Sequence, residues 1–219
     1  MKLLTVSYAI ALLLQSPLVH ALTVYQYQQL PGHFGGFSSD GSVITVADNF
    51  QVGQDTLIGG LSWWGGYLNA PPGPDNFTIC LYSDNGGQPE TLLEQYAFGA
   101  VNAVATGQFV NAPDLYPEFE YSANLPAPFL ARAGVTYWLS IVNPPADIWL
   151  WEASASALHP GVERSFNGNS WEPYYDNTAF ALVAVPEPRG MILITTGLAS
   201  MMVFTGRRRG TSSPHTRRP

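Results

Sequence analysis

The hydrophobic positions of this chain alternate with the period of β-strands, and no long stretch shows the period of a helix. Alternation is cleanest at residues 76–83, where Phe77, Ile79 and Leu81 share one face, and at residues 135–142. Because successive side chains of a strand point to opposite faces, these segments are predicted to be strands with one buried face. Further strands are predicted at residues 22–30, 42–46, 55–64, 118–125, 148–152 and 178–184.

Turn residues separate the predicted strands. Asp84-Asn85-Gly86-Gly87 indicates a tight turn, and Asn167-Gly168-Asn169 indicates a hairpin tip. The proline-rich stretch at residues 70–75 cannot belong to a strand, because proline donates no hydrogen bond to a neighbouring strand. Many short strands at close spacing predict an all-β fold, a single β-sandwich or jelly-roll-like domain over residues 22–184.

The N-terminus has the pattern of a signal peptide. Lys2 precedes an apolar run from Leu3 to Leu14, which is shorter than the roughly 20 residues that a membrane-spanning helix needs. Val19 and Ala21, which are compact and small, occupy the positions that a signal peptidase site requires before the cut. We therefore expect a signal helix over residues 1–21 and cleavage between Ala21 and Leu22 after passage through the Sec translocon. The alternative is an uncleaved anchor helix.

The C-terminus combines three features in a fixed order. Pro186-Glu187-Pro188 is followed by residues 190–206, which carry no charge, and then by Arg207-Arg208-Arg209. The apolar run is just long enough for a transmembrane helix, and the arginines would stay cytoplasmic under the positive-inside rule. Together, residues 185–209 resemble the PEP-CTERM sorting signal of Gram-negative bacteria. An ordinary single-pass anchor is the alternative.

The resemblance to PEP-CTERM proteins implies a sorting route. Exosortase, an integral membrane protease-transpeptidase, would recognise the tail while the inner membrane holds it, and would remove it. The body would then reach the cell surface or the extracellular polysaccharide matrix. This chain departs from the family pattern by continuing through residues 210–219, which we expect to be a disordered cytoplasmic end.

Two segments of the body also resemble secreted bacterial β-sandwich modules. They are the stretch from Phe77 to Pro89, and the stretch from Leu130 to Ile141, in which a glycine turn leads into an aromatic strand. In such modules these segments build the sandwich, and many carry no known activity.

The acidic charge of the body argues against nucleic acid as a partner. Between Leu22 and Val185 the chain has 15 acidic residues against 2 basic ones, Arg132 and Arg164, which leaves a net charge of −13. Such a body repels nucleic acid, so no nucleic-acid partner is expected. The one cysteine, Cys80, excludes an intramolecular disulfide and is expected to pack as a small hydrophobic residue.

No motif indicates catalysis, a cofactor or a metal centre. The mature body has two histidines, His33 and His159, and lacks a Gly-x-Ser-x-Gly elbow, a zinc-binding pattern and a phosphate-binding loop. Asp-Asn pairs in the predicted loops could ligate calcium, but they are also common turn formers. We therefore expect no catalytic residues, no metal and no cofactor, and a non-catalytic structural or binding role. A hydrolase of unrecognised type is an alternative.

Tryptophans offer the main candidate for ligand binding. Trp149 and Trp151 are predicted to point to the same side of one strand, and Trp63 and Trp64 to opposite sides of another. If exposed, such rings form a platform on which sugars stack, which would make the body a carbohydrate-binding module for extracellular polysaccharide. If they face inward, they belong to the core.

Overall fold

The computed structural model describes residues 22–27, 36–41, 43–68, 75–110, 116–144, 148–154, 161–165, 170–173 and 176–186. No helix within these ranges is long and apolar enough to cross a membrane. The predicted signal helix over residues 1–21, the predicted transmembrane helix over residues 190–206 and the predicted cytoplasmic end lie outside the described residues. So do Ala21, Glu187, Pro188 and Arg207 to Arg209, whereas Leu22 and Pro186 lie within them.

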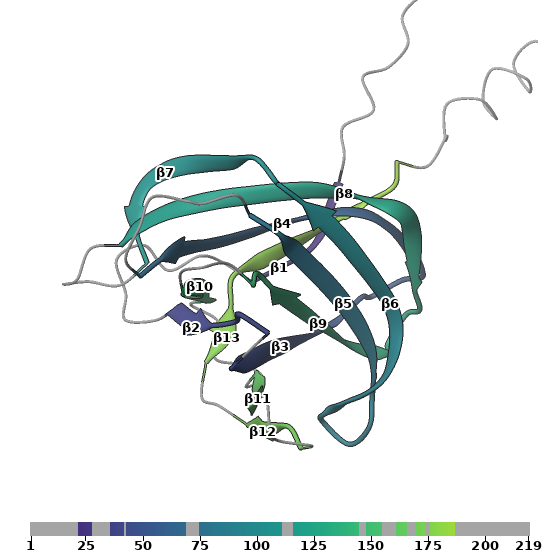
Figure 1. Ribbon diagram of the computed structural model, residues 1–219. Helices are drawn as coiled ribbons and strands as arrows, with labels where there is room; N and C mark the ends of the chain where they lie inside the picture. Colours follow the sequence, from purple (N-terminus) through teal and green to yellow (C-terminus); the bar gives the residue numbers. More distant parts are fainter. Residues whose placement is uncertain are drawn as a thin grey trace, which may run out of the picture. The chain divides into compact units, whose positions relative to one another are not determined.

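The predicted all-β fold is confirmed: two antiparallel sheets pack face to face as a sandwich (Figure 1). The eight-stranded sheet has the central order β1 (Leu22–Tyr27), β14 (Phe180–Ala184), β4 (Thr56–Tyr67), β10 (Trp149–Ser154) and β13 (Asn177–Thr178). In the same sheet β2 (Gly36–Ser38) pairs with β10, β8 (Pro117–Ala131) pairs with β4, and β7 (Ala103–Phe109) pairs with β8. The six-stranded sheet has the order β12 (Glu172–Pro173), β11 (Val162–Ser165), β3 (Ile44–Gln51), β9 (Thr136–Val142), β5 (Phe77–Asp84) and β6 (Pro89–Gly99).

Aromatic rings fill one part of the core between the sheets. The Phe77 ring lies at the centre of this group, with its centroid 5.0 Å from that of Trp63, 4.8 Å from that of Tyr121 and 5.1 Å from that of Trp149. All three contacts are edge-to-face, an arrangement worth about 0.5–1.5 kcal/mol per pair beyond the burial of the rings. Side chains from both sheets therefore lock this part of the sandwich together.

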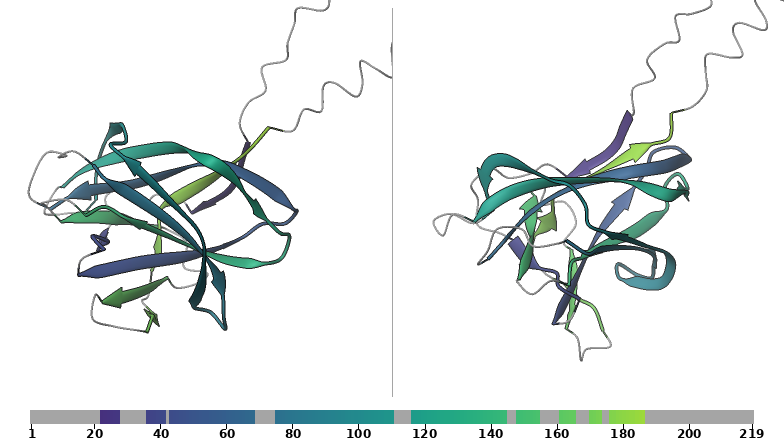
Figure 2. Two further views of the ribbon diagram at one scale, coloured as in Figure 1. Left: turned by 45° about the vertical axis from the view of Figure 1, so that its right-hand side comes forward. Right: turned by 45° about the horizontal axis from the view of Figure 1, so that its top comes forward.

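The first and last strands of the domain lie side by side. β1 pairs with β14 from Leu22, opposite Ala184, to Tyr27, opposite Phe180. In Figures 1 and 2 they are the purple and the yellow-green strands. The backbone N–H of Val185 donates to the carbonyl of Leu57 on β4 at 2.7 Å, so the sheet holds the chain to this point.

Two buried polar groups tie separate parts of the fold together. The Asp48 carboxylate on β3 accepts hydrogen bonds from the backbone N–H of Thr178 on β13 at 2.5 Å and from the Thr178 hydroxyl at 3.1 Å, which joins the two sheets. Burial raises the pKa of Asp48 to about 7 despite these bonds. The Asp75 carboxylate accepts from the hydroxyl of Tyr67 and, at 3.0 Å, from the amide of Asn143.

Candidate functional site

The four tryptophans considered as a possible binding platform lie inside the domain. Trp63, Trp149 and Trp151 belong to the main core and are 0% exposed. Trp64 points to the other side of β4, as predicted, but packs against Ala179 and Ala181 and is 8% exposed. Of the two alternatives, this burial contradicts the platform and agrees with the core, because none of these rings offers a face on which a sugar could stack.

Tryptophan fluorescence should report this burial directly. All six tryptophans of the chain are buried, so emission of the folded protein is expected to lie well to the blue of tryptophan in water. Acrylamide should quench it severalfold less than after unfolding in urea. Strong quenching of the folded protein, close to that of the unfolded chain, would contradict the inward placement of the rings.

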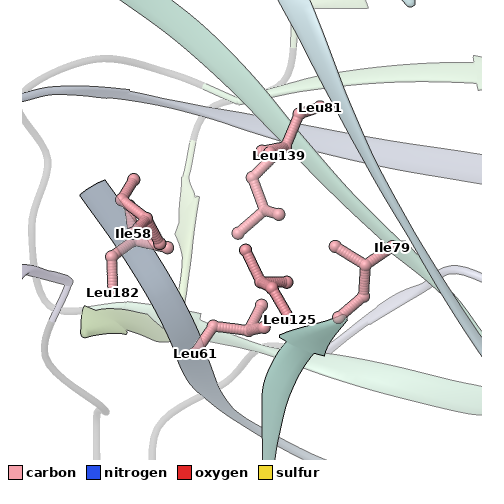
Figure 3. A pocket seen from close by; sticks show the side chains of 7 residues that line it. All are labelled: Ile58, Leu61, Ile79, Leu81, Leu125, Leu139 and Leu182. Atoms are coloured by element: carbon pink, nitrogen blue, oxygen red, sulfur yellow. The ribbon is translucent and has the colours of Figure 1, made fainter. Parts of the chain in front are cut away.

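One small cavity lies between the sheets, and it is not a ligand site (Figure 3). Its volume is ≈ 10 Å³, about that of a single water-sized sphere. Only aliphatic side chains line it, so a water molecule there would find no hydrogen-bond partner. They are Ile58, Leu61, Ile79, Leu81, Leu125, Leu139 and Leu182.

The outer face of the six-stranded sheet carries a different group of residues. Strand alternation turns Ile79 and Leu81 of β5 inward, so Cys80 and Tyr82 point outward. Tyr82 pairs in register with Trp138 on β9, which therefore also faces outward. Trp171 completes a small cluster with Trp138, Ala47 and Val162, against which Tyr82 packs. We call Tyr82, Asp84, Trp138, Arg164 and Trp171 the outer aromatic patch.

The contacts within the outer aromatic patch fix its geometry. The guanidinium carbon of Arg164 lies 4.6 Å from the centroid of the Trp171 ring, a cation–π contact. The Tyr82 ring meets Trp171 edge-on at 6.1 Å between centroids. The indole N–H of Trp138 donates to Asp84 Oδ1 at 2.7 Å. The amide of Gln88, in the turn between β5 and β6, donates to the carbonyl of Trp171 at 3.1 Å and attaches this turn to the patch.

Cys80 lies beside the patch but is not an activated nucleophile. Burial raises the pKa of its thiol, and the Tyr82 hydroxyl and the Arg164 guanidinium lower it only in part. Burial also raises the pKa of Tyr82 far above its ordinary value. Both groups therefore stay protonated at neutral pH, so neither the thiol nor the phenol supplies a reactive anion.

A pair of buried carboxyl groups lies on the eight-stranded sheet. Glu118 on β8 and Glu152 on β10 are each 1% exposed. Burial raises the pKa of Glu152 to about 10, and the adjacent Glu118 carboxyl adds to this shift. At neutral pH Glu152 is therefore a neutral acid that contacts Glu118. Among the described residues no three His, Cys, Asp or Glu side chains gather as a metal site would require.

Sequence reasoning did not single out the outer aromatic patch. Its five residues come from β5, β9, β11 and the segment before β12, so no short motif joins them. The one sequence signal was the rarity of cations in the body, since Arg164 is one of only two between Leu22 and Val185. Of the predicted sorting residues, only Pro186 is described, and it follows the last strand closely.

Comparison with known proteins identifies the body alone. A search of the curated proteins finds no relative that matches the chain. The family described as "Domain of unknown function (DUF7901)" matches residues 25–184, which make up most of the chain and coincide with the β-sandwich. By this match, the chain belongs to the DUF7901 family.

Proposed function

We propose that this protein is exported, sorted by a PEP-CTERM-type tail and delivered to the cell surface or the extracellular polysaccharide matrix, where it has a non-catalytic structural or binding role. Exosortase and the Sec translocon are its proposed processing partners. The inner membrane would hold the tail, residues 185–209, before the tail is removed.

The observation that carries this proposal is the position of the fold relative to the two proposed cleavage points. Residues 21–185 form one compact unit, and the first described strand begins at Leu22. The last strand ends at Ala184, two residues before Pro186. Cleavage after Ala21 and near Pro186-Glu187-Pro188 would therefore remove both ends without cutting a strand. The family match, residues 25–184, also stays inside these limits.

Intact-mass measurement tests this route. The protein recovered from cells that contain exosortase is expected to begin at Leu22 and to lack the chain beyond about Pro188, whereas cells without exosortase should yield a protein that retains residues 191–219. Retention of the tail in both strains would contradict exosortase processing and leave a domain with an ordinary C-terminal anchor.

A charge-reversal experiment separates the sorting signal from the general effect of a basic tail. Changing Arg207, Arg208 and Arg209 to Glu is expected to disturb membrane orientation and block tail removal, because these arginines would no longer favour the cytoplasmic side. The matched control changes Arg217 and Arg218 to Glu and should be processed normally. Equal processing of all three proteins would count against the sorting proposal.

A second candidate function is binding of extracellular polysaccharide. The four buried tryptophans do not favour it, but the outer aromatic patch does, because it combines the half-buried Tyr82 ring with a guanidinium and a carboxylate. Sugar binding commonly uses apolar ring contacts together with hydrogen bonds to the hydroxyl groups. This candidate is compatible with the sorting route, since a matrix protein would meet polysaccharide at its destination.

A further inference from the structure

The two arginines of the body differ in their surroundings. Arg132 forms an ion pair with Asp55 at 2.7 Å, and both side chains are well exposed. Among the residues that the structure describes, Arg164 has no carboxylate within ion-pair distance. In a domain with 15 acidic residues this is unexpected, because a mobile arginine on such a surface would readily find a carboxylate.

The backbone of β11 and β12 turns two acidic side chains, Glu163 and Glu172, away from Arg164. Glu163 precedes Arg164 on β11, so it points to the other face of the strand. Glu163 lies directly opposite Glu172 on β12, which places both carboxylates on that other face. The cation–π contact with Trp171 holds the half-buried Arg164 at the outer face instead. The fold therefore keeps one cation in place and separate from neighbouring carboxylates.

A guanidinium held over an aromatic ring can still bind a planar anion. The group is planar and carries its N–H donors around the edge of that plane. Two parallel N–H groups match the two oxygens of a carboxylate, which gives bidentate, charge-assisted hydrogen bonds. The cation–π contact with Trp171 restricts the Arg164 side chain, and the hydrogen bond from Gln88 to the Trp171 carbonyl in turn ties Trp171 to the turn after β5, so less conformational entropy is lost when an anion binds.

The other members of the patch suit a sugar ring attached to that carboxylate. Tyr82 is half-buried, so part of its ring is available to the apolar C–H face of a sugar. Asp84 is also half-buried, and its Oδ1 accepts from Trp138 at 2.7 Å while its Oδ2 accepts only a long bond, 3.4 Å, from the backbone N–H of Gly87, so a lone pair on Oδ2 can accept from a hydroxyl group. The exposed amide of Gln88 lies at the same edge.

We propose that the outer aromatic patch binds a carboxylated saccharide, a uronic acid unit of an extracellular polysaccharide, with Arg164 holding the carboxylate and Tyr82 contacting the ring. This inference deepens the second candidate function and rests on it. Nucleic acid and other densely charged phosphate polymers fit poorly, because a net charge of −13 surrounds a single available cation. The ligand therefore contributes one carboxylate at the patch and neutral hydroxyl groups elsewhere.

Binding of a short neutral oligosaccharide that carries a single uronic acid unit to the full chain, purified in mild detergent and followed by calorimetry, tests the proposal. The matched ligand is the same oligomer with its one carboxylate methyl-esterified, which keeps the rings and removes the charge. Arg164→Gln is expected to weaken binding of the acidic oligomer by roughly tenfold or more, because hydrogen bonds to a charged group are lost. Arg164→Lys should recover only part of the affinity, since lysine keeps the charge but lacks the fork.

Three outcomes would overturn the proposal. They are equal binding of the acidic and the esterified oligomers, unchanged binding by Arg164→Gln, and an equal loss caused by the control Arg132→Gln at the exposed ion pair. A sulfated oligomer is expected to bind less well than the uronate, because its anion is not planar, and stronger binding of the sulfated oligomer would also count against a carboxylate ligand. If the saccharide does not bind but the tail is removed normally, the sorting proposal stands and the binding proposal fails. If the saccharide binds but the tail is not removed, the binding proposal stands and the sorting proposal fails.

Discussion

Glu152→Gln is expected to stabilise the protein at neutral pH. Burial beside Glu118 raises the pKa of Glu152 from 4.5 to about 10, so the folded state keeps a proton that the unfolded chain releases. The stabilisation from this proton is complete below pH 4.5 and is lost as the pH rises toward 10. At pH 7 the free energy of unfolding of the parent is therefore roughly 3 kcal/mol lower than it is below pH 4.5, at about 1.4 kcal/mol for each pH unit above 4.5. Glutamine cannot ionise, and its amide can still donate to Glu118, so the variant avoids this cost.

Urea unfolding between pH 4 and pH 9 measures the effect. The free energy of unfolding of the parent should fall as the pH rises, and that of the variant should fall much less steeply. Asp48, whose pKa burial raises to about 7, adds a decline of the same sign between pH 3.8 and 7 in both proteins, so the difference between them isolates Glu152. Glu163→Gln, on the half-buried β11, is the matched control and should follow the parent. Parallel curves for parent and Glu152→Gln would show that Glu152 is ionised in the folded state.

The strands that the sequence predicted correctly are those whose two faces meet different surroundings. On β5 and β9 one face packs in the core, so the alternation of residues 76–83 and 135–142 marks that burial. The turn at residues 84–87 was predicted for the same local reason: Gly86 and Gly87 adopt φ angles of 64° and 89°, which glycine permits without strain.

The strands that the sequence did not reveal are mostly exposed. β6 begins with Pro89 and contains residues common in helices, including Leu92, Leu93 and Glu94. It pairs with β5 alone and leaves most of its side chains in water, so no burial pattern marks it. The tight turn after Asp84 determines its conformation by bringing it back along β5. Tertiary pairing overrides local propensity here.

Alternation also leaves open which face of a strand is buried. It predicted correctly that Trp149 and Trp151 share a face, and their ring centroids lie 6.5 Å apart. The choice between core and surface depends on what covers that face, and the covering residues, such as Phe77 and Phe180, come from distant strands. The outer aromatic patch was unpredicted for the same reason, because Arg164 and Trp171 meet Tyr82 only after the six-stranded sheet has formed.

Gly65→Ala is expected to destabilise the protein strongly for the addition of one methyl group. Gly65 lies in β4, opposite Trp151 on β10 and Phe119 on β8. A Cβ atom there would lie 2.8 Å from Cζ2 of Trp149 and in still closer contact with the carbonyl oxygen of Leu150. Neither can give way cheaply, since one belongs to a fully buried ring and the other to the backbone of β10. Overpacking of this kind costs about 1–3 kcal/mol, and backbone clashes lie at the upper end.

The loss should come from a specific break between β4 and β10. To admit the methyl group the strands must separate where Tyr67, Gly66 and Gly65 pair with Trp149, Leu150 and Trp151, and the edge-to-face contact of Trp149 with Phe77 would loosen with them. Gly53→Ala is the matched control, because a Cβ atom there meets nothing within 4 Å, so it should be neutral or slightly stabilising. Urea unfolding of both variants checks the prediction. Equal stability of Gly65→Ala and Gly53→Ala would mean that β10 does not lie against β4 at this point, and the buried placement of Trp149 and Trp151 would then be wrong as well.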